Sequence, residues 1–258
     1  VEVVISNGIP SFSIVGMADV TIMESRERVK AALRASGFVM PTDKIVINLA
    51  PGALKKTGSG FDLPIALGIL AATGQIEKEY ISSNLVVGEL LLDGSVRAPK
   101  GMLAYQQCAY SQGYNLLTGV SEQGIFNMEG LSCYALERLN HIRTGRFASH
   151  KTFAPIEVHE QIDYAEVIGH EAAKRALQVA AAGNHGVLMV GPPGSGKTML
   201  AQRFATILPE LSEAEKIEAA LVHSVAGEDI SPILAGQRPF RSPHHSATAA
   251  GLIGGGKP

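Results

Sequence analysis

One junction limits what this chain can fold into more than any other stretch of its sequence. From Val187 to Ala205, the sequence VLMVGPPGSGKTMLAQRFA passes from an apolar segment, through three glycines and two prolines, into a helical pattern. Residues 186–190 predict a buried strand, and the residues after the turn predict a helix with Leu200, Phe204 and Ile207 facing inward. A strand, a glycine turn and a helix in this order predict an α/β fold with a parallel sheet in this part of the chain.

The turn itself has the composition and spacing of a phosphate-binding loop. GPPGSGKT satisfies the pattern GxxxxGK[ST], with a strand predicted before it and a helix after it. Its glycines let backbone N–H groups reach phosphate oxygens, which a Cβ would prevent. We expect the lysine to reach the β- and γ-phosphates of a nucleoside triphosphate, and the threonine hydroxyl to coordinate Mg²⁺. A turn that only joins a strand to a helix is the alternative, and both context and spacing argue against it. The expected nucleotide-binding residues are Gly191, Pro192, Pro193, Gly194, Ser195, Gly196, Lys197 and Thr198.

Composition and charge narrow the class of protein. The 258 residues are 46% apolar and 18% charged, which fits a globular protein of two domains. The formal net charge of −2 provides no global attraction to nucleic acid or to an anionic membrane. The longest apolar run, near Leu63–Ala72, is shorter than the roughly 20 residues of a membrane span, so no membrane partner is expected. Cys108 and Cys133 lack metal-site spacing, which favours reduced thiols and a cytoplasmic location. Because the chain starts at Val1 in strand-like sequence, we expect the true N-terminus to lie upstream.

The remaining pattern predicts two domains. Residues 1–145 are expected to form an α/β domain, residues 146–161 a linker, and residues 162–258 part of a second domain. Strands are predicted at VEVVIS, KIVINLA, YNLLTG and LSCYAL, with a hairpin turn at Asp93-Gly94.

Two helices of the first domain have recognisable ends. MESRERVKAALRASG is expected to end before Gly37, and LPIALGILAATG to start at an N-cap, Asp62, and to end before Gly74. The apolar positions at helical spacing in the first helix are Met23, Val29, Ala32 and Leu33.

Longer phrases of the sequence resemble one family. YAEVIGHEAAKRAL resembles the adenine-side segment of AAA+ ATPases, which adds Val167, Ile168 and Gly169 to the expected nucleotide site. RPFRSPHHSATAAGLIGGGKP resembles the insertion of the magnesium-chelatase branch of these ATPases. NGIPSFSIVGMADVTIMESRERVKAAL, INLAPGALKKTGSGFDLPIALGILAATG and VVGELLLDGSVRAPKGMLA resemble the N-terminal Lon-protease-like domain of the bacterial ComM/YifB family. This resemblance covers nearly the whole chain. It implies ATP as the nucleotide, a homo-hexameric ring, and ATP-driven branch migration of DNA during natural transformation.

The same resemblance allows a protease to be considered. Lon-type proteolysis needs a serine nucleophile and a lysine base. Gly60 occupies the place of the serine, with Ser59 one residue away. Leu103 occupies the place of the lysine, with Lys100 three residues away. Because such chemistry needs close placement of both groups, we expect no protease activity.

Hydrolysis of ATP needs an acidic pair at a strand end and an arginine from a neighbouring subunit. Glu228 and Asp229 follow Ala-Gly, which predicts a turn instead of a strand end. We therefore expect a chain that stops before the Walker B strand, and that binds ATP without turning it over alone.

A small basic patch near the end of the sequence is a candidate DNA contact. It comprises Arg238, Arg241 and Lys257, with a solvated loop as the alternative. His244 and His245 lack a third ligand at zinc spacing. Two further functions stay open: an ATPase motor of a metal-chelatase-type complex, and a scaffold that uses nucleotide only to order an assembly.

Overall fold

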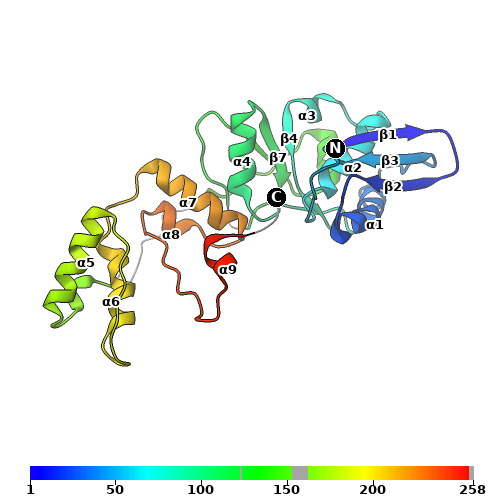
Figure 1. Ribbon diagram of the computed structural model, residues 1–258. Helices are drawn as coiled ribbons and strands as arrows, with labels where there is room; N and C mark the ends of the chain where they lie inside the picture. The colour runs from blue at the N-terminus through cyan, green and yellow to red at the C-terminus, as the bar shows by residue number, and fades with distance from the viewer. Residues whose placement is uncertain (123, 153–161, 256–258) are drawn as a thin grey trace. The chain divides into compact units, whose positions relative to one another are not determined.

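A computed structural model of the chain describes residues 1–122, 124–152 and 162–255. It separates into two compact units (Figure 1). The first comprises Val1–Ala154 together with Leu221–Asp229, and the second comprises Pro155–Ala220 together with Ile230–Pro258. Within the described residues, no helix combines the length and the apolar character required to cross a bilayer.

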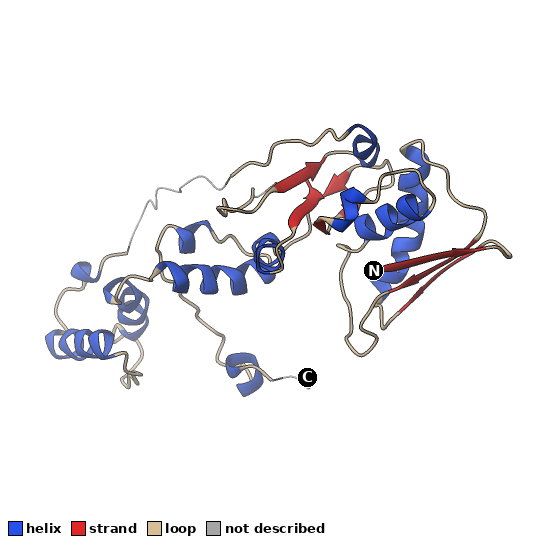
Figure 2. Cartoon of the chain, turned by 90° about the horizontal axis from the view of Figure 1, so that it is seen from above, coloured by secondary structure: helices blue, strands red, loops and turns tan. Residues whose placement is uncertain are grey.

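The first unit contains a three-stranded sheet built from β1 (Glu2–Ser6), β2 (Ser11–Val15) and β3 (Lys44–Asn48). β3 lies between the other two strands, antiparallel to β1 and parallel to β2 (Figure 1). Figure 2 shows helices packed on one side of this sheet. Ile45 and Ile47 on β3 point into the core, and Val46 between them faces the other side. This alternation places one apolar face of the sheet against helices, as period-two patterning predicts.

A second sheet of the first unit is entirely parallel. It contains β4 (Asn84–Val86), β7 (Asn115–Gly119) and β8 (Cys133–Leu136), in the order β4-β7-β8. β5 (Glu89–Leu90) and β6 (Val96–Arg97) form an antiparallel hairpin, with Gly94 at φ +83° in its turn. The strands and the hairpin that the sequence predicts in this unit are therefore confirmed.

Helices cover both sheets of the first unit. They are α1 (Val20–Ala35), α2 (Asp62–Ala72), α3 (Glu79–Ser82), α4 (Met102–Ser111) and the 3-10 helix η1 (Leu139–Thr144). The N-cap of α1 is Asp19, whose carboxylate accepts a hydrogen bond from the Ile22 N–H at 2.9 Å. Gly37 and Gly74 adopt left-handed conformations just after α1 and α2, as predicted for helix stops.

Two details of these helices were predicted wrongly. Met23 is exposed, and Ile22 and Ser25 are buried in its place. Ile22 is seven residues before Val29 and so shares its helical face, whereas Met23, six residues before it, does not. Asp62 is not an N-cap: it is the first residue of α2, is wholly buried, and binds Arg28.

Among the described residues of the second unit, all regular secondary structure is helical. They are η2 (Tyr164–Glu166), α5 (Glu171–Gly183), α6 (Lys197–Phe204), η3 (Ala205–Ile207), α7 (Glu213–Val225, whose end is assigned to the first unit), α8 (Ser231–Leu234) and α9 (Ala249–Ile253). A small core of Tyr164, Val167, Leu177 and Leu200 joins η2, α5 and α6, and Phe204 and Ile207 pack against it. The inward face predicted for the helix after the turn is thus confirmed.

The strand predicted at residues 186–190 is not formed. Leu188 and Val190 are each 88% exposed, and no described residue of the second unit belongs to a strand. An extended segment becomes a strand only when neighbouring strands accept and donate its backbone hydrogen bonds, and none is present here. The chain is an α/β protein, as predicted, but its parallel pairing lies in the first unit.

The first unit also extends past the predicted boundary at residue 145. Ala148 pairs with Ala135, and Thr152 pairs with Ile125. The first part of the predicted linker, residues 146–152, is therefore tied to this unit, and its residues 153–161 lie outside the described residues.

Candidate nucleotide-binding site

The phosphate-binding loop lies directly before α6, and glycines shape it. Gly194 and Gly196 have φ values of +78° and +79°, in the left-handed region that other residues rarely adopt. Gly196 is the N-cap of α6, so the left-handed turn leads straight into the helix. No heavy atom lies within 4 Å of where a Cβ on Gly194 would stand, so the backbone is open to a ligand at this point.

Lys197 is the central charged group of the loop. Its Nζ lies 2.8 Å from the Gly191 carbonyl oxygen, 2.7 Å from that of Pro192 and 3.2 Å from Ser195 Oγ. All three partners are uncharged oxygens, and no carboxylate pairs with Lys197 within the part of the chain that the structure describes. The ammonium is therefore held inside the loop with its charge uncompensated, as an anion-binding group requires.

The start of α6 supplies further groups for an anion. The first hydrogen bond of the helix runs from the Leu200 N–H to the Gly196 carbonyl at 3.0 Å. The amides of Lys197, Thr198 and Met199 precede this bond and belong to the unpaired first turn. Together with the helix dipole they favour negative charge at this point. Thr198 is exposed, so its hydroxyl is accessible next to these amides.

The second predicted segment, Val167–Gly169, lies close to the loop. Val167 is buried, and its carbonyl accepts a hydrogen bond from Lys174 Nζ at 3.1 Å, while Gly169 turns the chain at φ +75°. The turn brings in His170, whose Nε2 is 3.3 Å from where a Cβ on Gly196 would stand. The structure therefore brings the two predicted parts of the site together, with the Ile168 side chain exposed beside them.

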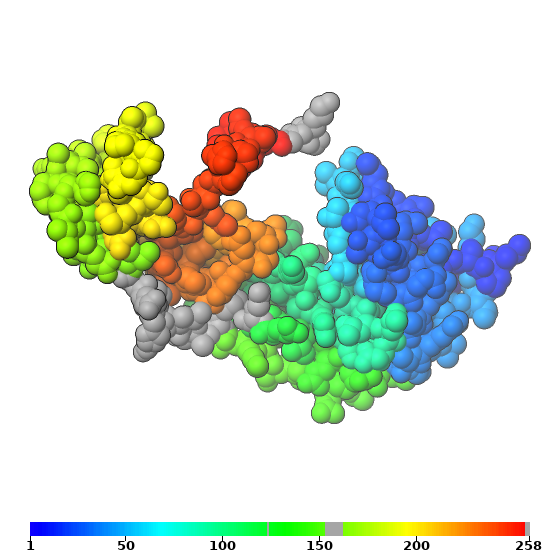
Figure 3. Space-filling model, turned by 90° about the horizontal axis from the view of Figure 1, so that it is seen from below, coloured from blue at the N-terminus to red at the C-terminus, as the bar shows by residue number. Residues whose placement is uncertain are grey.

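Contacts between helices hold the two segments in place. Figures 1 and 3 show α5 and α6 side by side. Arg203 on α6 pairs with Glu166 at 2.6 Å, and the Tyr164 hydroxyl donates to the Lys174 carbonyl at 2.8 Å. Neither His170 nor the Arg203–Glu166 pair was anticipated. The pair joins residues 37 positions apart, and no local pattern in the sequence indicates it.

The acidic pair Glu228 and Asp229 follows α7, in a turn as predicted. Gly227 has φ +77°, and the Glu228 carboxylate lies 2.7 Å from His223 Nδ1. These acids therefore do not stand at the end of a strand.

The candidate DNA contacts lie in a loop before α9. Arg238 Nε donates to the Pro209 carbonyl at 2.6 Å, and Arg241 lies on the same loop. Lys257 lies outside the described residues. In this loop the rings of His244 and His245 lie with their centroids 4.0 Å apart and their planes tilted by 41°.

The loop of the first unit that resembles a protease site carries different groups. Gly60 has no side chain to act as a nucleophile, and the neighbouring Ser59 hydroxyl donates to the Glu89 carboxylate. Leu103 is buried in the core, whereas Lys100 is exposed.

Comparison with protein families gives matches in both parts of the chain. A family model described as magnesium chelatase, subunit ChlI, matches residues 163–258. A second, described as subunit ChlI of Mg-chelatase, matches residues 1–118.

Individual relatives match almost the whole chain. YifB of Salmonella typhimurium is 39% identical over 264 residues, and the competence protein ComM of Haemophilus influenzae is 39% identical over 268 residues. Each alignment covers 99% of this chain and 52% of the relative, so the chain spans about half the length of these proteins. A shorter similarity, 34% identity over 91 residues, covers 35% of this chain and 13% of an archaeal Lon protease from Methanothermobacter thermautotrophicus.

Proposed function

Because this chain belongs to the family of YifB and ComM, the magnesium-chelatase-like AAA+ ATPases, we propose that residues 191–198 and 167–169 bind ATP with Mg²⁺. We propose further that the whole protein uses this ATP to move branched DNA. The observation that carries the proposal is the Lys197 ammonium, which lies among uncharged oxygens at the start of a helix.

Each part of the site has a separate task in this proposal. Lys197 neutralises the β- and γ-phosphates, which requires its Nζ to exchange the two loop carbonyls for phosphate oxygens. The unpaired amides at the start of α6 donate to the phosphates. Val167, Ile168 and Gly169 contact the adenine, with the exposed Ile168 side chain offering an apolar surface to the base.

The residues of the loop also fit a magnesium ion bound with the nucleotide. Thr198 presents an accessible hydroxyl in the first turn of α6, and hydroxyl and phosphate oxygens are the ligands that Mg²⁺ prefers. When bound, the ion neutralises charge that develops on the phosphates during transfer. This chain holds the triphosphate so that the Thr198 hydroxyl oxygen faces the phosphates.

DNA is proposed as the partner of the whole protein. The relative from Haemophilus influenzae is named a competence protein, which supports a role in the handling of transforming DNA. Arg238 and Arg241 are proposed to contact DNA phosphates, with a homo-hexameric ring as the working assembly.

The protease-like part of the chain is proposed to act without cleaving peptides. The Ser59 hydroxyl donates to the Glu89 carboxylate, and Leu103 occupies the place where a Lon protease has its lysine base. Incubation of the whole protein with unfolded casein should leave the casein intact, and reproducible cleavage would overturn this part of the proposal.

The nucleotide site is tested by Lys197→Ala, with Lys216→Ala as a matched control. Lys216 pairs with Glu213 on α7 and is not one of the proposed site residues. A charge-assisted contact to phosphate contributes about 1.5 to 3 kcal/mol, so Lys197→Ala should weaken MgATP binding roughly 10- to 100-fold in calorimetry, while the control stays unchanged. Equal affinities for the two variants would contradict the proposed site.

The DNA function is tested with the whole protein on a synthetic four-way junction. ATP-dependent conversion of the junction into two duplexes, lost in Lys197→Ala, is the expected result. ATP hydrolysis that DNA does not stimulate would instead favour a metal-chelatase-type motor. Nucleotide binding without hydrolysis would favour a scaffold.

A further inference from the structure

The first unit contains a pocket on the face of the sheet β4-β7-β8 opposite α4. Alternation along the strands creates this face, since Leu116 packs with α4, whereas Leu117 and its register partner Tyr134 point the other way. The pocket has a volume of about 360 Å³, within the range of roughly 300 to 1,000 Å³ that is typical of ligand sites. All of its lining residues lie within residues 77–147, so the pocket belongs to the first unit alone.

Three aromatic rings line the pocket, each from a different element. Tyr80 belongs to α3, Tyr134 to β8, and Phe147 to the segment after η1. The centroid of the Phe147 ring lies 6.4 Å from that of Tyr80 and 5.1 Å from that of Tyr134. Each of the three side chains packs against the main core but is only partly buried there. The rest of each ring surface is therefore accessible to a bound group.

Backbone contacts hold these rings in place without a ligand. The Ala148 N–H donates to the Ala135 carbonyl at 2.8 Å, which ties the residue after Phe147 to β8. Gly145, with φ +60°, brings the same segment close to α3, because a Cβ on Gly145 would stand 3.3 Å from the Tyr80 hydroxyl oxygen. A preformed arrangement of rings reduces the entropy that a ligand loses by ordering its site.

The charged side chains of the pocket are all negative. Glu77 and Glu79 line it, and no lysine, arginine or histidine does. Lys78 stands between them in the sequence but is not a lining residue. Neither carboxylate forms an ion pair with any residue that the structure describes. Their charge is therefore free to attract a cation into the pocket.

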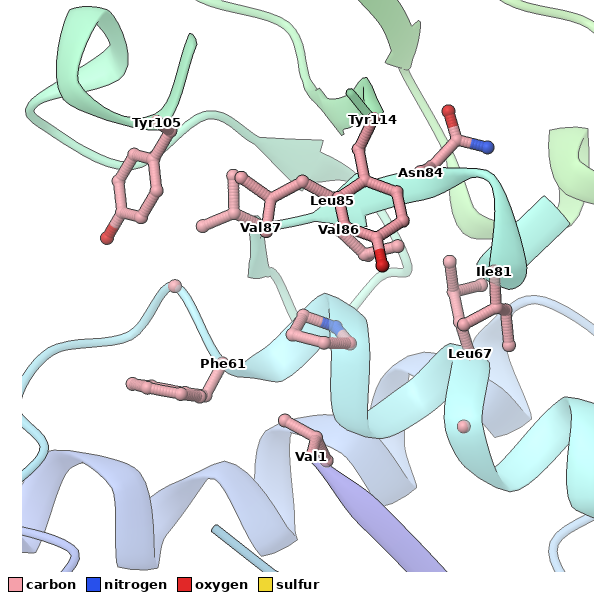
Figure 4. A pocket seen from close by; sticks show the side chains of 13 residues that line it. Val1, Phe61, Leu67, Ile81, Asn84, Leu85, Val86, Val87, Tyr105 and Tyr114 are labelled. Carbon is pink, nitrogen blue, oxygen red and sulfur yellow. The ribbon is translucent and has the colours of Figure 1, made fainter. Parts of the chain in front are cut away.

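Asn84 adds to the negative potential at the pocket. In Figure 4 its amide points away from Phe61 and Tyr105, which line a neighbouring apolar groove. Its Nδ2 donates to the Tyr80 carbonyl at 3.0 Å, but its buried Oδ1 has no partner among the described residues. Buried polar atoms are usually paired, so the partial negative charge of this oxygen is uncompensated. An unpaired acceptor of this kind favours a cation nearby over an anion.

The lining argues against the other classes of ligand. A phosphate or a carboxylate would be repelled by Glu77 and Glu79. No group of three or more His, Cys, Asp and Glu side chains in the described part of the chain could hold a metal ion. An organic cation fits both kinds of lining, because its charge meets the carboxylates and its methyl groups meet the faces of the rings.

We propose that this pocket binds an organic cation, either a quaternary ammonium or a methylated amine. The rings of Tyr80, Tyr134 and Phe147 contact its methyl groups, and Glu77 and Glu79 compensate its charge. Free small cations and methylated lysine side chains of proteins share this chemistry. The binding does not depend on the nucleotide site, since none of the proposed ATP-binding residues lines the pocket.

The test measures the binding of radiolabelled choline to the whole protein by equilibrium dialysis. The matched control ligand is 3,3-dimethylbutan-1-ol, which has the shape of choline but no charge. We expect saturable binding of choline and roughly tenfold weaker competition by the alcohol, because the rings and the carboxylates both act on the charge. Equal competition by unlabelled choline and the alcohol, or an absence of saturable choline binding, would overturn the proposal.

A pentapeptide with trimethyllysine at its centre distinguishes the two sources of the cation. If the peptide displaces labelled choline at lower concentrations than unlabelled choline does, the ligand is a methylated protein. If the peptide requires higher concentrations, the ligand is a free small cation. Both results agree with the proposed chemistry of the pocket.

A matched set of variants locates the cation on the protein. Glu77→Gln with Glu79→Gln removes both lining charges, whereas Glu129→Gln removes an exposed glutamate that does not line the pocket. All three side chains are exposed, so the fold should tolerate each change. The double variant should weaken choline binding roughly three- to tenfold, and the control should leave it unchanged. Equal affinities of the two proteins for choline would overturn the assignment.

The proton resonance of the choline methyl groups gives an independent measurement. Ring currents move the resonances of protons that lie over an aromatic face upfield, so the methyl resonance of bound choline should shift in that direction. Phe147→Leu keeps an apolar side chain but removes one ring of the lining, and should reduce the shift. An unshifted resonance, or an equal shift in Phe147→Leu, would overturn the proposal, because the rings would then not contact the cation.

Discussion

Replacement of Arg28 by methionine tests whether one buried ion pair holds the first unit together. Asp62 is completely buried at the start of α2. Its Oδ2 lies 2.6 Å from Arg28 Nε, and its Oδ1 lies 3.0 Å from Arg28 Nη2, so the guanidinium binds the carboxylate at two points. The Leu90 N–H and the Ser25 hydroxyl also donate to this carboxylate. Arg28→Met removes the only one of these partners that carries a charge.

The size of the effect follows from the burial of Asp62. A surface ion pair contributes about 0 to 1 kcal/mol, but removing one partner of a buried pair costs about 3 to 5 kcal/mol, because the remaining charge stays away from water. Arg28 is 23% exposed, and only its partner is fully buried, so the methionine itself adds little cost. For a unit of this size the loss corresponds to a fall in Tm of roughly 6 to 20 °C.

Hydrogen exchange followed by mass spectrometry measures this stability for the first unit alone. Amides of β3 report on its core, because Ile45 and Ile47 are buried there. The double variant Arg28→Met with Asp62→Asn should recover part of the stability, since it leaves no buried charge. If Arg28→Met changes the free energy of unfolding by less than about 1 kcal/mol, the assignment of Asp62 as a charged, Arg28-dependent group is wrong.

Three further predictions concern other parts of the chain. Gly196→Ala should weaken MgATP binding in calorimetry. A left-handed φ of +79° costs a residue with a Cβ about 1 to 2 kcal/mol. Unchanged affinity would show that the loop does not bind the nucleotide in this conformation. Arg238→Ala with Arg241→Ala should flatten the slope of log K against log salt for duplex DNA by about 1.8, which corresponds to two phosphate contacts, and identical slopes would exclude them. Burial raises the pKa of the Cys133 thiol, so less of its thiolate is present near pH 8. Iodoacetamide should therefore modify Cys133 more slowly than the exposed Cys108, as measured by mass spectrometry. Equal modification rates of the two cysteines would refute this prediction.

The local parts of the candidate site could be predicted from the sequence. Gly194, Gly196 and Lys197 have their positions fixed by residues within one turn of chain, and a motif records such short-range geometry directly. The helix stops at Gly37 and Gly74 belong to the same class, because each needs only its own left-handed conformation.

Features that depend on distant partners could not be predicted in this way. Asp62 has the sequence context of an N-cap, but its partner Arg28 is 34 residues away, and a bidentate buried pair is far stronger than a cap. The apolar segment 186–190 has strand propensity, but propensity forms no strand without a neighbouring ladder. His170 meets the phosphate loop only because Gly169 turns the chain, which the spacing of the motif does not encode.

The bonds around Gly60 bear on the proposed lack of protease activity. Gly60 lines an apolar groove beside β4 and occupies the place where the resemblance to Lon proteases puts a serine. A Cβ at this position would stand 3.1 Å from a Val87 methyl group, so a longer side chain would press on the strand that borders the groove. The Gly60 carbonyl is already used by the Gly88 N–H, and the Ser59 hydroxyl by Glu89. These bonds fix the loop beside β4, so neither Gly60 nor the Ser59 hydroxyl is available as a free nucleophile. We therefore expect a peptide that reaches this loop to stay uncut.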